Sequence, residues 1–522
     1  MKFLRCRSAL FLRCSYSITN YAPAKVNQTN YKKSPIQGEC NEKILLEKDL
    51  NLMTSFEAKV TNANAFTIYK PRLKRFVRII RTLHIDNEVV KNRSLEKMLK
   101  RFEGKKLLIL GATANEIPLV KRAQELGAYV ITTDYNTDFR KSPAKNVSDE
   151  YWNVSWSDID ELEKRCRTTG INGVTAGFSE IRIDNMIKLC ERLDLPCYVS
   201  SKQLAITRNK ALFKAECRRN GVPTINEYES LDAVTRYPVI VKPTDRAGSI
   251  GVGIAYDRVG LEEAFKIAYE KSLEKTVIIE DYITDATEFD VHYAVCNGKI
   301  TLLTTDDIIP ASGNQKDGKV VQSAWMYPSK YEKDYLNSVS QNIESMIQNM
   351  GILDGTIFFS GFVHKNGEFS FFECGYRLWG EQEFSYDYMC GKMNYLDIYI
   401  YHALTGSCAD ISGNPNGAMK NGVELNLYVT GGTISRIEGI DKIAENRDCY
   451  LHIIDSYVGQ ECTFENAILT KAALIGFANS DPLQLKKDIE EAYSVLHVCD
   501  ENGKNMFYDH VNTDVIGTWW SR

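Results

Sequence analysis

The sequence predicts a protein of mixed α/β and α+β class, with an open parallel α/β domain first and hairpin-rich α+β regions after it. Three observations support this prediction. Strand and helix patterns alternate from Lys105 to about residue 200, Asn-Gly pairs separate apolar runs at two later places, and Asp481-Pro482 opens an amphipathic helix near the end. With 522 residues, the chain is long enough for about two to four domains.

The first domain is expected to begin with a strand, a turn, a helix and a second strand, in KKLLILGATANEIPLVKRAQELGAYVITTDYN from Lys105. Its residues Leu119, Ala123 and Leu126 recur at helical spacing. GVTAGFSE, IDNMIKLCERLD and PCYVS continue the pattern as a strand with its loop, a helix and a strand. Such alternation favours a parallel sheet with helices on both faces.

A nicotinamide-dependent enzyme is one interpretation of this first domain. Asp134 ends the second strand, where a dinucleotide-binding fold places the acid that binds the ribose. However, the turn that begins at Gly111 lacks the second and third glycines of that fingerprint. We therefore rank this interpretation low.

Two hairpins are expected in the middle of the chain, where Asn297-Gly298 separates FDVHYAV from KITLLTT and Asn366-Gly367 separates TIFFSGFVH from EFSFFE. Asn-Gly is favoured there because both central residues of a tight hairpin turn need a positive φ. A helix is expected before them in LEEAFKIAYE. The tail predicts a small α+β module, with ELNLYVTGGTISRIEG as a further hairpin and a helix after the Asp-Pro pair.

The composition excludes several classes of protein. The 64 basic and 68 acidic residues give a net charge of −4, which offers no electrostatic argument for binding nucleic acid. No apolar run reaches the roughly 20 residues that a membrane-spanning helix needs. The 14 cysteines include no C-x-x-C pair, so zinc ribbons and redox dithiols are not expected. Free thiols fit a reducing compartment, and we expect a cytoplasmic protein.

Residues 1–100 are expected to be an N-terminal extension, partly disordered or helical. Up to Glu39 they contain basic but no acidic residues, so MKFLRCRSALFLRC fits an organelle-targeting helix, an unstructured tail or a true start at Met53. The basic stretch YKPRLKRFVRIIRTLH, residues 69–84, has helical apolar spacing. We favour a helix packed on the body of the protein over a helix on a membrane surface.

Four later segments carry residues suited to a nucleotide site. They are NKALFKAECRRNGVPT, YPVIVKPTDRAGSIGVG, TVIIEDYITDATEFDVHYAV and FFECGYRLWGEQEF, and they contain Lys210, Lys242, Glu280, Glu288, Glu373 and Arg377. The second segment has a glycine-rich turn, which commonly brings backbone N–H groups to phosphates. Its lysine precedes the glycines, which excludes a Walker A loop. The residues after the turn look extended, which excludes a dinucleotide fingerprint.

Together and in this order, the four segments resemble the ATP-grasp superfamily, and the resemblance covers about residues 105–510. It implies a pre-ATP-grasp α/β domain at 101–203, similar to that in carbamoyl-phosphate synthetase and biotin carboxylase. A two-lobed ATP-grasp domain then spans 204–410, with its small lobe at about 230–295. Residues 411–522 resemble the C-terminal α+β module of amino-acid ligases, which completes the large lobe.

The resemblance implies that ATP lies between the two lobes, beneath the glycine-rich hairpin. It assigns the phosphates to the side chains of Lys210 and Lys242 and to the backbone of Ser249, Ile250 and Gly251. The lysines act as separate point charges, so they need not follow the glycines. Because Lys242 would neutralise charge on the phosphoryl group during transfer, we expect it to be a catalytic residue.

The resemblance assigns the EDYI segment to the adenine. Glu280 would accept from the amino group, and the backbone of Tyr282 and Ile283 would pair with the ring. Glu288 matches the acid that holds the ribose hydroxyls. Without the resemblance, the two glutamates would be surface carboxylates on either side of a turn.

The expected Mg²⁺ (or Mn²⁺) site departs from the family pattern, which supplies a Glu or Gln on one strand and Glu-x-Asn-x-Arg on the next. Glu373 is in place, but Ser360 occupies the first position and Gly375 replaces the asparagine. Glu381 or Glu383 could supply the missing ligand, since carboxylate oxygens suit a hard cation.

The resemblance implies an ATP-dependent ligase that joins a small-molecule carboxylate to an amine through an acyl phosphate, releasing ADP and phosphate. Arg377 is expected to act as a catalytic residue that holds the acyl phosphate, and a structural ion pair is the alternative. Asp306, Asp307 and Glu180 are candidates for holding the amine. A homodimer is one expectation for the assembly, and neither substrate can be named.

Two other functions stay open. A non-catalytic ATP-binding module with a degenerate metal site would explain Ser360 and Gly375. A carboxylase or carbamoyl-phosphate enzyme ranks lower, because the chain has neither a second grasp unit nor a biotin-accepting Met-Lys-Met motif.

Overall fold

The computed structural model describes residues 101–521, apart from 247, 249, 312–320, 392, 409–410, 412–418 and 463–469. These residues belong to one compact unit. The expectations for residues 1–100, including the helix at 69–84, lie outside the described residues. No helix in the described part of the chain is long and apolar enough to cross a membrane.

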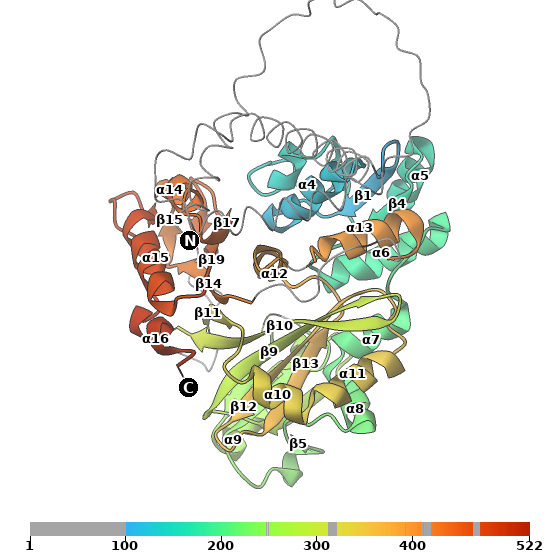
Figure 1. Ribbon diagram of the computed structural model, residues 1–522. Helices are drawn as coiled ribbons and strands as arrows, with labels where there is room; N and C mark the ends of the chain where they lie inside the picture. The colour runs from blue at the N-terminus through green and yellow to red at the C-terminus, as the bar shows by residue number, and fades with distance from the viewer. Residues whose placement is uncertain are drawn as a thin grey trace, which may run out of the picture. The chain divides into compact units, whose positions relative to one another are not determined.

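A four-stranded parallel sheet, in the order β3-β2-β1-β4, forms the first layer (Figure 1). Its strands and helices are β1 (Lys106–Leu110), α4 (Ile117–Glu125), β2 (Tyr129–Thr133), β3 (Glu150–Trp152), α5 (Ile159–Thr169), β4 (Gly173–Thr175) and α6 (Glu180–Leu193). The connections from β1 to β2 and from β3 to β4 run in opposite directions along the sheet. Right-handed crossovers therefore put α4 and α5 on opposite faces. The predicted parallel α/β domain is confirmed.

The strand expected at PCYVS is wrong. Residues 196–200 do not pair with the sheet but lead into α7 (Ser201–Arg208), although Tyr198 is buried. The Tyr198 ring packs edge-on against the rings of Tyr376 and Tyr399. The apolar run in the sequence therefore reflects burial against other rings and not a place in the sheet.

An eight-stranded antiparallel sheet, in the order β13-β12-β9-β10-β11-β14-β19-β17, follows. Its strands are β9 (Ala286–Cys296), β10 (Lys299–Pro310), β11 (Gln322–Tyr327), β12 (Gly355–His364), β13 (Phe369–Gly375), β14 (Asn421–Val429), β17 (Cys449–Ile454) and β19 (Thr470–Asn479). Both Asn-Gly hairpins are confirmed, since β9 pairs with β10 and β12 with β13. Asn297 and Gly298 have φ angles of 50° and 75°, as a tight hairpin turn requires.

Two consecutive helices, α10 (Glu332–Ser338) and α11 (Ser340–Asn349), pack on one face of the large sheet (Figure 1). On this face the Phe289 ring of β9 lies 5.4 Å from the Tyr335 ring of α10. Alternate residues of a strand point to opposite faces, so Asp290 projects from the other face. That second face carries Glu288, Asp290 and His292 of β9.

A four-stranded antiparallel sheet, in the order β5-β8-β6-β7, forms a smaller layer. Its strands and flanking helices are α8 (Lys210–Asn220), β5 (Glu227–Tyr228), β6 (Val239–Pro243), β7 (Gly253–Ala255), α9 (Arg258–Lys271) and β8 (Val277–Asp281). The helix expected after the glycine-rich turn is confirmed as α9, which buries Leu261, Ala264 and Ala268 against β6. We propose that the small lobe extends from β5 to β8, because β9 belongs to the large sheet.

The C-terminal part extends the large sheet instead of forming the hairpin expected in ELNLYVTGGTISRIEG, and that prediction is wrong. β14 pairs with β11 and β19. The next short strands pair elsewhere, β15 (Gly432–Thr433) with β18 (Glu461–Cys462) and β16 (Arg436–Glu438) with β20 (His497–Cys499). The physical reason is that β14 is buried on both faces, as the burial of Val423 and Glu424 illustrates, and such a strand belongs inside a sheet.

The remaining helices are α12 (Phe384–Met389), α13 (Leu396–Thr405), α14 (Ile440–Ala444), α15 (Pro482–Val495) and α16 (Thr513–Thr518). The predicted helix after the Asp-Pro pair is confirmed as α15, where the Asp481 side chain accepts from the backbone N–H of Leu483.

Helix α13 joins the first sheet to the large sheet. The carbonyl oxygen of Ala403 lies 2.3 Å from the place that a Cβ on Gly173 of β4 would take, so this close approach requires glycine. On the other side, the Tyr399 hydroxyl lies 2.6 Å from the hydroxyl of Thr356 in β12. The helix therefore fixes the start of β12 relative to β4.

Candidate functional site

A row of polar side chains crosses four strands of the large sheet. In register, Asp306 of β10 pairs with Asp290 of β9, Asp290 with Ser360 of β12, and Ser360 with Glu373 of β13. Residues that are directly opposite in a sheet project from the same face. Three carboxylates and one hydroxyl therefore lie side by side on the face that α10 and α11 leave uncovered, and we call these four residues the acid row.

Glu288 and His292 extend the acid row along β9, since each is two residues from Asp290. Glu288 accepts a 2.8 Å hydrogen bond from Gln322. Burial and the nearby Glu373 and Asp306 raise the pKa of Glu288 to about 7. His292 Nε2 lies 2.9 Å from Asp306. Glu288 therefore resists ionisation beside the acid row.

His292 offsets part of this negative charge. Burial opposes protonation of the ring, but the hydrogen bond with Asp306 and the nearby charge of Glu383 raise the pKa of His292 well above its usual value. His292 Nδ1 lies 3.5 Å from Glu383 Oε1. His292 thus lies between two acids, Asp306 and Glu383.

Three buried carboxylate oxygens in and beside the acid row have no hydrogen-bond partner among the described residues, namely Asp290 Oδ1, Asp306 Oδ1 and Glu383 Oε2. Burial raises the pKa of Asp290 well above its usual range, and it raises the pKa of Asp306 to about 7. A buried polar atom without a partner destabilises the fold by about 1–3 kcal/mol. Hard oxygen donors in this arrangement fit a cation such as Mg²⁺.

Glu280 of β8 lies between two lysines. Lys242 Nζ of β6 is 2.9 Å from Glu280 Oε2, and Lys214 Nζ of α8 contacts Glu280 Oε1. Burial opposes ionisation of Glu280, but Lys242 and Lys214 together lower its pKa below the usual value. Lys214 is 0% exposed and also donates to the carbonyl of Ile225 at 2.9 Å.

The sequence analysis missed Lys214. It lies four residues after Lys210, so both project from the same side of α8. Lys210 Nζ donates to the carbonyl of Arg246 at 2.8 Å, directly before the glycine-rich turn. The four-residue spacing of the two lysines in NKALFKAEC could have predicted that Lys214 lies beside Lys210.

The glycine-rich turn is described except for residues 247 and 249, so Ser249 lies outside the described residues. Gly248 and Gly251 have φ angles of 63° and 76°, a left-handed conformation that suits glycine. Ile250 is 41% exposed at the tip. Beyond β8, the backbone N–H of Tyr282 donates to the carbonyl of Pro238. Hydrogen bonds to an adenine ring would then have to come from the backbone of Ile283 and from the Tyr282 carbonyl.

Arg377 lies where β13 meets the first domain. Its Nε is 3.3 Å from Glu180 in the first turn of α6, and its guanidinium lies 5.0 Å from the centre of the Phe358 ring. Both Arg377 and Glu180 keep about one-fifth of their side chains exposed. The pair therefore links the large sheet to α6 and still reaches solvent.

Packing explains the glycine at position 375. A Cβ there would lie 2.5 Å from ring carbons of Phe358 on the adjacent strand. An asparagine would need that ring to move.

The other candidate acids face different partners. Glu381 lies 3.7 Å from Lys471, whereas Glu383 lies beside His292. Asp307 points away from the acid row and accepts from Ser329 and Trp519.

Comparisons with known proteins agree on the fold. Residues 183–371 match the family model for the D-ala D-ala ligase C-terminus. An L-amino acid ligase from Bacillus licheniformis superposes with a TM-score of 0.62 and 18% identity, covering 77% of this chain and 100% of that one. Biotin carboxylase from Campylobacter jejuni gives a TM-score of 0.63 with 15% identity, covering 80% and 95%.

This chain has the ATP-grasp fold. The ATP-grasp resemblance inferred from the four sequence segments is thereby confirmed. A biotin carboxylase domain from Hydrogenobacter thermophilus, solved with MgADP, superposes with a TM-score of 0.62 and 14% identity, covering 80% of this chain and 94% of that one.

Curated relatives by sequence match only part of the chain. A formate-dependent phosphoribosylglycinamide formyltransferase of Prochlorococcus marinus is 24% identical over 277 residues, which are 49% of this chain and 66% of the relative. The carbamoyl phosphate synthase large chain of Buchnera aphidicola is 27% identical over 122 residues, covering 23% and 11%. The chain thus spans less than two thirds of the length of these relatives.

Proposed function

We propose that this protein is an ATP-dependent ligase that joins a carboxylate to an amine and releases ADP and phosphate. One observation carries the proposal. Lys242 of the small sheet reaches the acid-row face of the large sheet: its ammonium lies 5.4 Å from the centre of the Phe372 ring and opposes the rise in the pKa of Glu288. A lysine from one lobe and acids from the other thus face one space, as phosphoryl transfer requires.

ATP is proposed to lie between the small sheet and the acid row. Lys210 and Lys242 would contact the phosphates, with the backbone of Gly251 and its neighbours above them. Lys242 must then turn from Glu280 towards the nucleotide. Lys214 keeps Glu280 paired when that happens, so the carboxylate stays ionised and free to accept from the adenine amino group.

Glu373 and Asp290 are proposed to hold Mg²⁺ or Mn²⁺. Each pairs directly with Ser360 from an adjacent strand, and the unpartnered Oδ1 of Asp290 would supply the carboxylate that Ser360 lacks. When bound, the ion would neutralise charge on the phosphates. We prefer Asp290 to Glu381, because Glu381 lies beside Lys471.

The proposed reaction has two steps. A carboxylate oxygen of the first substrate attacks the γ-phosphorus, the bond to the β–γ bridging oxygen breaks, and ADP leaves. The amine nitrogen then attacks the acyl carbon, phosphate leaves with the C–O bonding pair, and the nitrogen loses a proton.

This chain's residues have separate roles in those steps. Lys242 would neutralise charge on the transferred group, and Arg377 would hold the acyl phosphate once released from Glu180. Asp306 is a suitable proton acceptor for the amine, because its pKa of about 7 lies near physiological pH.

The assembly and the location belong to the same proposal. A homodimer is proposed from the biotin carboxylase domain of Hydrogenobacter thermophilus, which is described as a dimer. The cysteines of the described part are free thiols, in keeping with a reducing compartment, and we propose the cytoplasm.

A second candidate is an ATP-binding module without turnover. Gly375 favours it, because Phe358 leaves no room there for the metal-binding asparagine of the family pattern. A carboxylase-type reaction is the third option and lacks a specific observation here.

An ADP-release screen separates these functions. The protein is incubated with ATP, Mg²⁺ and pairs of amino acids, other small carboxylates and amines, and products are identified by mass spectrometry. We expect one pair to release ADP with a product whose mass equals both substrates minus water. ATP binding without ADP release for any pair would favour the binding module. ADP release that requires bicarbonate would favour the carboxylase-type reaction.

A further inference from the structure

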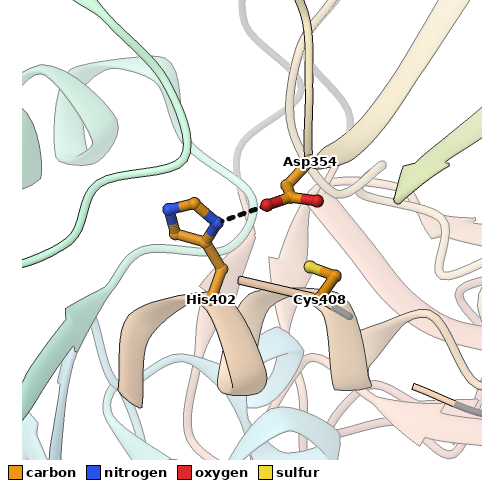
Figure 2. Close-up of side chains that lie close together, drawn as sticks. All are labelled: Asp354, His402 and Cys408. Atoms are coloured by element: carbon orange, nitrogen blue, oxygen red, sulfur yellow. Dashed lines mark hydrogen bonds and ion pairs between the residues drawn. The ribbon is translucent and has the colours of Figure 1, made fainter. Parts of the chain in front are cut away.

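Four side chains with metal-binding atoms meet where α13 ends against the large sheet. Cys296 is the last residue of β9, Asp354 directly precedes β12, His402 is in the last turn of α13, and Cys408 follows that helix. Figure 2 shows the His402 ring directed at the Asp354 carboxylate, with the Cys408 sulfur beside them. None of these residues belongs to the acid row.

The distances within the cluster are short. His402 Nδ1 lies 2.8 Å from Asp354 Oδ2. One ligand atom each from Asp354, His402 and Cys408 lie within 4.8 Å of one another. The Cys296 thiol lies close enough to Cys408 for each to shift the pKa of the other. One oxygen, one nitrogen and one sulfur therefore lie together, with a second sulfur beside the Cys408 thiol.

Ordinary hydrogen bonds position these side chains. Asp354 Oδ1 accepts from the backbone N–H of Asn297 at 2.8 Å, and Asp354 Oδ2 lies 2.8 Å from His402 Nδ1. The Cys408 thiol donates to the carbonyl of Ile398 at 3.4 Å. A bound cation would replace the Asp354–His402 contact and the thiol protons.

The donor set is that of structural zinc. Zinc takes four ligands from cysteine, histidine and aspartate at about 2.0–2.3 Å, which places neighbouring ligand atoms about 3.3–3.8 Å apart. The Asp354–His402 pair would need to open by roughly half an ångström. Asp354 and Cys408 are 4% and 2% exposed, so water has little access, as in closed structural sites.

We propose that Cys296, Asp354, His402 and Cys408 form a structural zinc site. The cysteines are far apart in sequence, so the absence of C-x-x-C pairs does not bear on it. Binding would replace the two thiol protons with bonds to zinc, releasing two protons to solvent without any oxidant or reductant. The site would fasten the end of α13 to the ends of β9 and β12, and it does not depend on the proposed ligase function.

Cobalt substitution of the full-length protein tests the site directly. The protein is treated with a chelator, dialysed and titrated with Co²⁺. We expect one equivalent to produce a thiolate-to-cobalt charge-transfer band and the visible bands of tetrahedral cobalt, both removed by one equivalent of Zn²⁺. The acid row contains no sulfur, so cobalt bound there gives no thiolate band. Absence of the thiolate band, or a Cys296–Cys408 disulfide in a non-reducing peptide map, would overturn the proposal.

Variants assign the ligands. Cys408→Ser and His402→Gln should lose the thiolate band or change it to that of a site with fewer ligands, and purified protein should lose its retained zinc. Cys217→Ala, which removes a buried thiol from α8, is the matched control and should retain one zinc per chain. A chelator should lower the Tm of the wild type and of this control, but not that of Cys408→Ser. Equal zinc content in all variants would refute the assignment, and the wild-type cobalt spectrum decides if a variant does not fold.

Discussion

Lys214 illustrates how a single buried residue can prepare a site for a ligand. It is fully buried, and its ammonium is held by Glu280 and the carbonyl of Ile225. Removing one member of a buried charged group leaves an uncompensated charge and typically costs about 3–5 kcal/mol. In the proposed site, Lys214 lets Lys242 leave Glu280 without that cost. Under the proposed function, Lys214 would act on ATP binding through Glu280 without touching the nucleotide.

Lys214→Met should weaken ATP binding while the protein stays folded. Lys242 would then be the main partner of Glu280 and would resist turning to the phosphates. We expect ATP affinity to fall about tenfold. This loss is near the smallest free energy that a charge-assisted hydrogen bond contributes, roughly 1.5–3 kcal/mol. Calorimetry measures this, with Arg218→Met on the exposed side of α8 as the control. Unchanged affinity would show that Glu280 does not couple the two lysines.

Asp290→Asn tests the position proposed to compensate for Ser360. Asp290→Asn and Glu373→Gln should each reduce ADP release by about 10²–10³-fold, because each removes a proposed ligand of the cation that would stabilise the transferred group. ATP binding in the absence of metal should be retained. Steady-state kinetics against Mg²⁺ concentration measures the effect, and Glu368→Gln at the exposed hairpin tip is the control. Normal turnover in Asp290→Asn would show that Asp290 is not a metal ligand and would leave Glu381 and Glu383 as the candidates.

Glu288 should make the ATP-free protein less stable as pH rises. Its folded pKa of about 7 lies above the ordinary value of 4.5, so the folded state binds more protons than the unfolded state between these values. The stabilising contribution is therefore complete below pH 4.5 and is lost as pH rises towards 7. Denaturant unfolding at several pH values measures this slope, and Glu288→Gln should make it shallower. A slope unchanged by the substitution would contradict the raised pKa.

At the scale of elements, the sequence predicted what is decided locally and failed where a distant partner decides. The turn at Asn297-Gly298 and the α9 helix follow from neighbouring residues, and both are confirmed. The pairing of β14 with β11 and β19 depends on strands far away in sequence, so turn signals alone suggested a hairpin that does not form. Similarly, Asp290 could not be predicted as part of the acid row without the register of β9 and β12.

Gly375→Asn should destabilise the β12–β13 hairpin, although it restores the family pattern. The new side chain would meet the Phe358 ring, and overpacking of this kind typically costs about 1–3 kcal/mol. Denaturant unfolding measures the loss. Gly380→Ala is the control, because a Cβ there meets no atom within 4 Å. Adding Phe358→Leu should recover part of the stability. An unchanged free energy of unfolding would show that the ring moves freely.

At the scale of the whole molecule, the small sheet, the large sheet and helix α6 of the first domain each supply residues for the proposed activity. The small sheet supplies Lys242, the large sheet supplies the acid row, and α6 of the first domain supplies Glu180 to Arg377. Phe102 marks where the described core begins, since it is 3% exposed and packs edge-on against Tyr401 of α13 at 4.8 Å.

A chain shortened to begin at Arg101 should therefore fold and bind ATP. A chain beginning at Lys105 should be less stable, because it loses the Phe102 ring, and removing a buried phenylalanine side chain costs about 3–5 kcal/mol. Thermal unfolding and calorimetry with ATP compare the two. If the chain that begins at Arg101 is insoluble, residues 1–100 must cover an apolar surface of the body.

The contact between Gly173 and Ala403 has a consequence for synthesis on the ribosome. Strand β4 ends at Thr175, but the helix that closes over its backbone begins only at Leu396. Translation proceeds at about 5–20 residues per second, so α13 is synthesised on the order of ten to forty seconds after β4. During that interval the uncovered apolar side chains of the first sheet would be prone to aggregation, so the yield of this protein in cells should depend on the rate of translation.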